Sequence, residues 1–310
     1  MNKNAPAFYS GNYFLATSII SAGYLLLSYF LIGFKTDQLF VVVLFNTLFY
    51  ATPLSRKFVT GFSIFIIYWV IFDYMKAFPN YRYNAIHIES LYNAEKHFFG
   101  IVHNGSTITP NEFLKLHTNN LLTVISGIFY LCWIPVPLAF ATYLFFTNKP
   151  LFFKFSLTFL WVNLLGFVIY YVYPAAPPWY VALNGFSLIE NTPGNPAGLA
   201  AFDAYFNMPV FKSLYAKSSN VFAAMPSLHS AYPLIVVYYS RKTILPLSVK
   251  LFLVLVAFGI WFGAVYTSHH YLLDVIAGIF TAVLGILLFN YMLRFKWLQT
   301  FENKMLLLTA

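Results

Sequence analysis

Charged residues are scarce in this chain, and acidic residues are the scarcest of them. Only 9% of the 310 residues are charged, with nine Asp and Glu against eighteen Lys and Arg. A soluble globular domain carries about 25% charged residues, and a disordered chain is poor in apolar ones, so the composition excludes both classes. Hydrophobic residues make up 60% of the chain. An all-α integral membrane protein is therefore expected, because helices satisfy their own backbone hydrogen bonds inside lipid.

Cysteine is nearly absent, and the N-terminus lacks the features of a secretory signal. The single Cys132 excludes an intrachain disulfide, and its apolar surroundings indicate a small buried hydrophobe. No charged segment followed by a small-residue cleavage site precedes Tyr13, so we expect no cleaved signal peptide. The net charge of +9 is explained by basic cytoplasmic loops and anionic headgroups, so no nucleic-acid partner is expected.

Apolar runs long enough to cross a bilayer, about 17–25 residues each, are abundant. They predict a polytopic helical bundle of about eight spans, near 12–34, 38–54, 58–75, 121–147, 152–173, 226–240, 248–267 and 271–293. The charge-free stretch that contains the sixth span starts at Ser218, so its outer part is expected to be a loop that dips into the membrane.

Basic residues follow every second span, in short loops. These loops hold Arg56, Lys57, Lys149, Lys154, Arg241, Lys242, Lys250, Arg294, Lys296 and Lys304. The positive-inside rule makes these loops and both termini cytoplasmic, and it puts the long connections 77–120 and 174–225 on the outer face.

One connection holds an amphipathic segment. Between residues 87 and 99, one helical face carries most of Ile88, Leu91, Tyr92, Phe98 and Phe99, whereas Glu89, Glu95 and Lys96 lie off it. This pattern predicts an interfacial helix. No repeat or composition shift divides the chain. We expect a single membrane domain over 1–310, with a catalytic core at 55–295 and accessory spans at 1–54.

Two histidine strings lie at the outer ends of apolar spans: 223–230 with His229, and 266–274 with His269, His270 and Asp274. Ionisable groups at membrane depth are costly and usually functional. On a helix, His270 and Asp274 would meet at i and i+4, so the carboxylate would orient the imidazole as a nucleophile. His229 would then serve as general acid and base.

Two other interpretations of these residues stay open at this point. The His270–Asp274 pair could be a structural pair that caps a helix. The three histidines with Asp274 could bind a metal, although adjacent His269 and His270 would point about 100° apart on a helix. The metal interpretation is the weaker one, and we expect no metal and no cofactor.

At these residues the sequence resembles the type 2 phosphatidic acid phosphatase superfamily, and most closely its inositol phosphorylceramide synthase-like branch. Pro226-Ser227-Leu228-His229 matches the superfamily's second motif with Leu in place of Gly, and His270 to Asp274 matches the third. The third motif's Ser-Arg is missing, since Gly263 and Ala264 stand there, and no intact first motif is found. The segments 72–76, 88–100 and 174–180 also look like the synthase branch.

The resemblance implies a six-helix phosphatase-like core, preceded here by N-terminal spans, and a metal-free site that forms a phosphohistidine. Carried over, His270 is the nucleophile, Asp274 its orienter and His229 the acid and base. Lys76 beside Asp73 is the first candidate to neutralise the phosphate, in place of the missing arginines. Further donors or pocket residues are expected at Ser227, Asn220 and Tyr180, and weaker candidates are Lys212, Lys217 and Trp179.

The predicted function is a lipid phosphotransferase. It would move a phosphoryl headgroup, phosphoinositol or a related one, from a glycerophospholipid to a ceramide-type lipid within the bilayer. The alternative is a lipid phosphate phosphatase that uses the same residues with water as the acceptor. A non-enzymatic lipid transporter is less favoured, because its polar site would lie at the bilayer centre, whereas these motifs lie at one face.

Overall fold

The computed structural model describes residues 11–217 and 220–310, and within them nearly all regular structure is helical. Backbone contacts group the chain into two compact units, one from Met1–Phe78 with Lys296–Ala310 and one from Pro79–Phe295. The predicted all-α polytopic membrane protein is confirmed by six helices, among the described residues, that are long and apolar enough to span a bilayer. The predicted division into core and accessory spans stays a prediction.

The first unit contains three apolar helices near the N-terminus and one helix at the C-terminus. They are α1 (Gly11–Ile32), α2 (Thr36–Ala51), α3 (Pro53–Tyr74) followed by the short helix η1 (Met75–Ala77), and α15 (Lys296–Thr309). Of the predicted spans, 38–54 corresponds to α2, a helix of 16 residues that is shorter than the other two. Helix α15 was not predicted, because its charged residues interrupt the apolar pattern.

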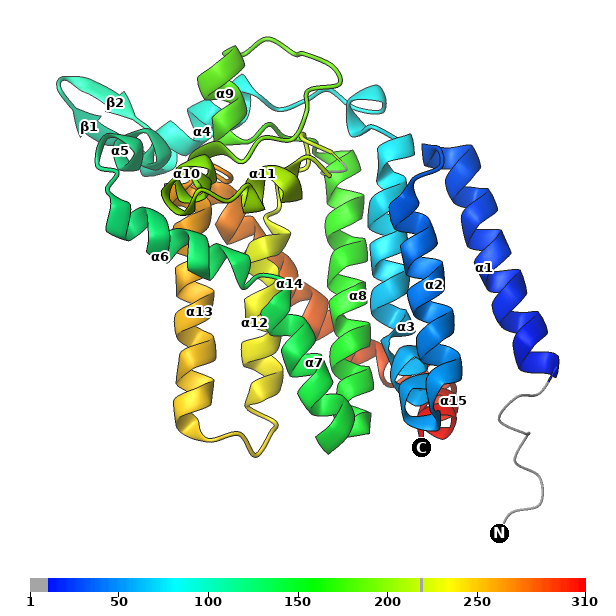
Figure 1. The fold of residues 1–310 in the computed structure, drawn as a ribbon. Helices are drawn as coiled ribbons and strands as arrows, with labels where there is room; N and C mark the ends of the chain where they lie inside the picture. Colours follow the sequence, from blue (N-terminus) through cyan, green and yellow to red (C-terminus); the bar gives the residue numbers. More distant parts are fainter. Residues whose placement is uncertain (1–10, 218–219) are drawn as a thin grey trace. The chain divides into compact units, whose positions relative to one another are not determined.

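The second unit is built around three long helices and one shorter helix (Figure 1). They are α8 (Lys149–Val172), α12 (Leu228–Ser240), α13 (Leu247–Tyr266) and α14 (Leu272–Met292), and α12 contacts each of the other three. Small residues permit the close packing. A Cβ on Gly278 of α14 would lie 2.1 Å from the Ser227 carbonyl oxygen, so this glycine brings α14 against the start of α12.

The predicted span 121–147 is broken in the structure. It forms α6 (Asn120–Leu131) and α7 (Pro135–Thr147), and the helix is interrupted before the prolines at 135 and 137. Proline cannot donate its backbone hydrogen bond, so the chain changes direction there. In Figure 1, α6 crosses the unit near its loop-bearing end, and α7 then runs along the long helices.

The predicted span 226–240 is α12, which begins at Leu228 and has only 13 residues. The preceding residues 220–227 are not helical, as expected for the outer part of this stretch. Ser218 and Ser219, where the stretch begins, lie outside the described residues. The described residues thus give six full-length candidates, one of which is α6 and α7 taken together, and two shorter apolar helices where the sequence predicts eight spans.

One end of the second unit carries its long connections (Figure 1). They contain α4 (Glu89–Phe99), α5 (Pro110–Leu116), α9 (Pro178–Asn184), α10 (Ala200–Phe206) and α11 (Val210–Tyr215). Short 3-10 turns, η2 (Asn80–Arg82) and η3 (Ala197–Leu199), and an antiparallel hairpin of β1 (Ile101–His103) and β2 (Ser106–Ile108) complete them. The sequence did not predict the hairpin. The amphipathic segment forms a helix, α4, and its interfacial position stays a prediction, but Glu95, expected off its buried face, is fully buried.

Candidate active site

The two histidine strings meet at the loop-bearing end of the second unit. His229 lies in the first turn of α12, and His270 lies in the connection between α13 and α14. The Nδ1 atom of His229 is 3.0 Å from the Nε2 atom of His270, so the two imidazoles contact each other directly. The sequence placed both histidines on one face of the membrane, and the structure brings them into hydrogen-bond contact.

The protonation of this pair can be worked out from its neighbours. The Nδ1 atom of His270 is 3.0 Å from the carbonyl oxygen of Ala224, which can only accept a hydrogen bond. The proton of a neutral His270 therefore lies on Nδ1, and Nε2 carries a lone pair. The Nδ1 atom of His229 must then be the donor to His270 Nε2. The resting pair thus holds one hydrogen between the two rings.

Asp274 lies behind His270. Its Oδ2 atom is 3.6 Å from His270 Nδ1 and accepts a hydrogen bond of 2.8 Å from the Tyr271 backbone N–H. The carboxylate is fully buried. The predicted pairing occurs, but the expected geometry is wrong: α14 begins at Leu272, so His270 precedes the helix and Asp274 reaches it from the first turn.

The loop that carries His270 is tied to several elements distant in sequence. The backbone N–H groups of His269 and His270 both donate to the Ala264 carbonyl. The buried side chain of Asn111 in α5 donates to the carbonyls of Val265 and His270, at 2.8 and 2.9 Å. These contacts set the direction of the His270 ring before any substrate binds.

The start of α14 is held by Glu95 from α4. Its two carboxylate oxygens accept the backbone N–H groups of Leu272 and Leu273, at 2.9 and 3.0 Å. A carboxylate at this place satisfies donors that have no partner within the helix. Burial raises the pKa of Glu95, and the two N–H donors oppose that rise. Glu95 therefore positions the turn that carries Asp274.

Aromatic side chains surround His229 and His269. The Tyr130 hydroxyl is 3.1 Å from His229 Nδ1, and the Trp133 ring meets the His229 ring edge-on at 4.5 Å. His269 is buried between Tyr130 and Tyr215, and its Nδ1 atom is 3.0 Å from the Thr267 hydroxyl. Burial lowers the pKa of His269 to about 3. His269 is therefore neutral and has a packing role.

Ser227, one of the predicted phosphate-binding residues, is occupied by structural contacts. Its backbone N–H donates to the Asp274 carbonyl at 2.9 Å, and its buried hydroxyl accepts from Ser230. Asn220 accepts the Phe222 backbone N–H with its side-chain oxygen, whereas its buried side-chain nitrogen has no partner among the described residues. Asn220 therefore keeps its side-chain N–H donors, and Ser227 keeps the hydrogen of its buried hydroxyl.

The remaining predicted site residues each have contacts of their own. Tyr180 is fully buried, and its hydroxyl donates to the Ser187 carbonyl and accepts the Ile189 backbone N–H, so it organises the 185–189 loop. Asp73 and Lys76 belong to the first unit, where they form an ion pair with each other. Among the weaker candidates, Lys212 lies in the first turn of α11, where its backbone N–H donates to Asp203, and Trp179 packs on Tyr180.

No cluster of three or more His, Cys, Asp or Glu side chains suited to a metal ion occurs in the described part of the chain. The reactive atoms that the geometry brings together are imidazole nitrogens. A buried lone pair on His270 Nε2, a carboxylate behind the same ring and a proton on the facing His229 are the components of nucleophilic catalysis with a general acid.

A family model described as the PAP2 superfamily matches residues 105–288, which include both histidine strings. The chain belongs to the PAP2 superfamily. It is 43% identical over 297 residues to the phosphoinositol dihydroceramide synthase of Bacteroides thetaiotaomicron, covering 94% of this chain and 96% of that protein. The predicted family is thus confirmed, and with it the predicted lipid phosphotransferase enzyme of the membrane.

Fungal members of the superfamily are more distant. The inositol phosphorylceramide synthase of Candida albicans is 31% identical over 197 residues, which are 60% of this chain and 40% of that protein. The catalytic subunit of the Saccharomyces cerevisiae synthase is 34% identical over 132 residues, 42% of this chain and 32% of the yeast protein. No solved structure matches the chain.

Proposed function

We propose that this PAP2 enzyme transfers a phosphoinositol-type headgroup from a glycerophospholipid to a ceramide-type lipid, in two steps through a phosphohistidine on His270. The observation that carries the proposal is the orientation of the His270 ring. Its Nδ1 atom is turned to the Ala224 carbonyl and the Asp274 carboxylate, so its Nε2 lone pair faces His229. The name of the Bacteroides relative supports the choice of headgroup and acceptor.

In the first step, His270 Nε2 attacks the phosphorus of the donor diester. A P–N bond forms, and the P–O bond to diacylglycerol breaks. The leaving oxygen takes the Nδ1 proton of His229, which enters this step as an imidazolium and leaves it as a neutral imidazole. The phosphorylated imidazole gains positive charge, which the Asp274 carboxylate at 3.6 Å stabilises.

In the second step, the hydroxyl of the ceramide-type lipid attacks the phosphohistidine. His229 removes its proton, a new P–O bond forms and the P–N bond to His270 breaks. The two nitrogens are only 3.0 Å apart at rest, close to the distance of a near-attack approach, so the incoming phosphate must part the two rings. This places the donor phosphate between α12 and the 267–271 connection.

The sidedness of the site is part of the proposal. Within the second unit, His229 and His270 lie at one end of the long helices, and Lys149, Arg241 and Lys242 lie at the other (Figure 1). The positive-inside rule then puts the basic end and both termini in the cytoplasm and the histidines on the outer, periplasmic or lumenal face. Asp73 and Lys76 stay candidates for contact with the phosphate.

The test is turnover of a labelled glycerophospholipid donor by purified, reconstituted protein, with and without ceramide, read by mass spectrometry. We expect a ceramide carrying the donor's phosphoryl headgroup, together with an equal amount of diacylglycerol. Release of free phosphate from a lipid monophosphate, at a rate indifferent to ceramide, would instead make this chain a phosphatase.

A further inference from the structure

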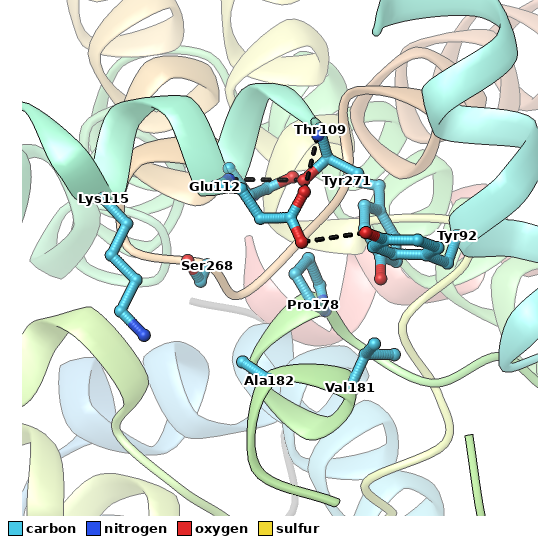
Figure 2. A pocket seen from close by; sticks show the side chains of 10 residues that line it. Tyr92, Thr109, Glu112, Lys115, Pro178, Val181, Ala182, Ser268 and Tyr271 are labelled. Atoms are coloured by element: carbon cyan, nitrogen blue, oxygen red, sulfur yellow. Dashed lines mark hydrogen bonds between the residues drawn. The ribbon is translucent and has the colours of Figure 1, made fainter. Parts of the chain in front are cut away.

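A cavity with both polar and apolar walls lies beside the histidine loop, and the proposed transfer mechanism does not use it. It has a volume of about 220 Å³ and is lined by α4, α5, α9 and the 268–271 connection (Figure 2). Pockets that hold drug-sized ligands have about 300–1,000 Å³. The cavity therefore suits one small ring and excludes an acyl chain.

The cavity shares a wall with the nucleophile's loop. Ser268 and Tyr271 line it, and they stand two residues before and one residue after His270. Two residues of extended chain span at most about 7 Å. Asn111 joins the two places directly, because it lines the cavity and donates to the His270 carbonyl. A group bound in the cavity is thus close to the loop that would carry the phosphoryl group.

Two buried polar atoms in the lining are unpaired. The Tyr271 hydroxyl and the Asn111 side-chain oxygen have no hydrogen-bond partner among the described residues, although both residues are at most 2% exposed. Leaving such a group buried and unpaired destabilises the fold. Buried, unpaired polar atoms in a cavity wall indicate a ligand that completes their hydrogen bonds.

The lining also contains one charge of each sign. Glu112 accepts the Tyr92 hydroxyl at 2.9 Å and the Thr109 backbone N–H at 2.7 Å, so its carboxylate is held in place. Lys115, one turn further along α5, has no ion-pair partner in the described part of the chain (Figure 2). Burial and the bond to Glu112 raise the pKa of Tyr92 to about 12, so its hydroxyl stays a donor.

This charge arrangement selects among headgroups. A free phosphate in the cavity would be repelled by Glu112, and the ammonium of ethanolamine or choline would be repelled by Lys115. A neutral ring of hydroxyls can donate to Glu112 and Asn111 and accept from Lys115 and Tyr271, since each hydroxyl does both. The apolar side chains of Pro178, Val181 and Ala182 offer the carbon face of such a ring a surface to pack on.

We infer that this cavity binds the polyhydroxylated ring of the donor's headgroup and so determines which phospholipid delivers its phosphoryl group to His270. The inference rests on the proposed transfer and names the site of its donor selectivity. A cyclic polyol such as myo-inositol is the ligand class, as the headgroup of a lipid or as the free ring.

The test uses the full chain in proteoliposomes and three variants. Tyr271→Phe removes one hydroxyl and Lys115→Met one charge, and Tyr205→Phe is the control, because that tyrosine is exposed on α10. Turnover is measured with an inositol phospholipid donor and with an ethanolamine phospholipid donor. Binding of free myo-inositol to the same preparations is followed by calorimetry.

We expect Tyr271→Phe to raise KM for the inositol donor about tenfold while kcat falls less than threefold, because one hydrogen bond to the ring is lost. Lys115→Met should narrow the preference for the inositol over the ethanolamine donor by a similar factor, since the repulsion of the ammonium disappears. Calorimetry should show millimolar binding of free myo-inositol that both variants weaken. Tyr205→Phe should match the parent in every measurement.

Two results distinguish a failure of the polyol site from a failure of the transferase proposal. If the parent transfers phosphoinositol and both variants keep its KM and donor preference, the cavity is not the headgroup site, although the transferase stands. If no donor is turned over but the parent binds myo-inositol and Tyr271→Phe does not, the transferase proposal fails and the polyol site stands. Equal myo-inositol binding by parent and Tyr271→Phe would overturn the polyol site in either case.

Discussion

Replacement of Asp274 by asparagine tests whether charge behind the nucleophile drives the first step. The side chain keeps its size, and its remaining carbonyl oxygen can still accept the Tyr271 N–H at the start of α14. The change removes only the negative charge 3.6 Å from His270 Nδ1. The fold should therefore survive, and the cost should fall on the step in which the imidazole becomes cationic.

The expected loss of turnover rate follows from the distance between the Asp274 carboxylate and His270 Nδ1. Two unit charges 3.6 Å apart, at an effective dielectric constant of about 20, attract each other by about 4–5 kcal/mol. Each 1.36 kcal/mol is tenfold in rate, so Asp274→Asn should slow turnover roughly a thousandfold. The assay is transfer of a fluorescent headgroup donor to ceramide in proteoliposomes, with the melting temperature in detergent recorded beside it.

Asp203 provides the matched control. It is also a buried aspartate, and it accepts the backbone N–H groups of Phe211 and Lys212 at the start of α11. Asp203→Asn should lower the melting temperature and leave most of the activity. The electrostatic account would be refuted if Asp274→Asn kept more than a tenth of the parent's rate. It would also be refuted if Asp203→Asn lost as much of that rate as Asp274→Asn.

Four further outcomes are expected. Gly278→Ala should lower both stability, by about 1–3 kcal/mol, and activity, because its methyl group would push the Ser227 carbonyl away from α14 and displace the start of α12. Unfolding stability should fall by about 2 kcal/mol between pH 7.5 and pH 5, because unfolded chains protonate His269 near pH 6.5 and the fold does so only near pH 3. Headgroup transfer should persist after dialysis against EDTA, since the proposed steps use only nitrogen and carboxylate groups. A cysteine placed at exposed Ser106, in a chain with Cys132→Ser, should react with an impermeant maleimide added to the outer side.

Each of these has its own control. Gly23→Ala, where the new methyl group meets nothing within 4 Å, should be neutral, and equal damage there would discount the packing argument. If the unfolding free energy of His269→Asn no longer depends on pH in this range, the dependence belongs to the His269 ring. If it depends on pH as the parent's does, another group is responsible. Activity lost in EDTA and restored by a metal ion would revive a metal site. Labelling from the cytoplasmic side alone would invert the topology.

The sequence was most informative where rare residues stand in apolar surroundings. His229, His270 and Asp274 were identified because ionisable side chains at the ends of apolar spans are costly. Their convergence, however, depends on α12 and α14 packing together, which a local pattern does not show. The i,i+4 argument reached the right pair through the wrong geometry, since His270 belongs to a turn and not to the helix.

The residues that the sequence analysis missed act over long chain separations. Asn111 reaches His270 across 159 positions, and Glu95 reaches Leu272 across 177. Glu95 and Glu112 belong to a set of only nine acidic residues in the chain, and that scarcity was the available signal. The amphipathic pattern instead placed Glu95 toward water, because helical periodicity cannot distinguish solvent from a buried helix end.

The direct contact between the two histidines has a consequence for cell energetics. In the proposed mechanism, the hydrogen between them leaves with diacylglycerol and is replaced from the acceptor's hydroxyl, so a complete cycle exchanges no proton with either compartment. Neither the pH difference nor the voltage across the membrane then contributes to the equilibrium of headgroup exchange. The balance between the two lipids is set only by their abundance in the bilayer and the stability of their phosphodiester bonds.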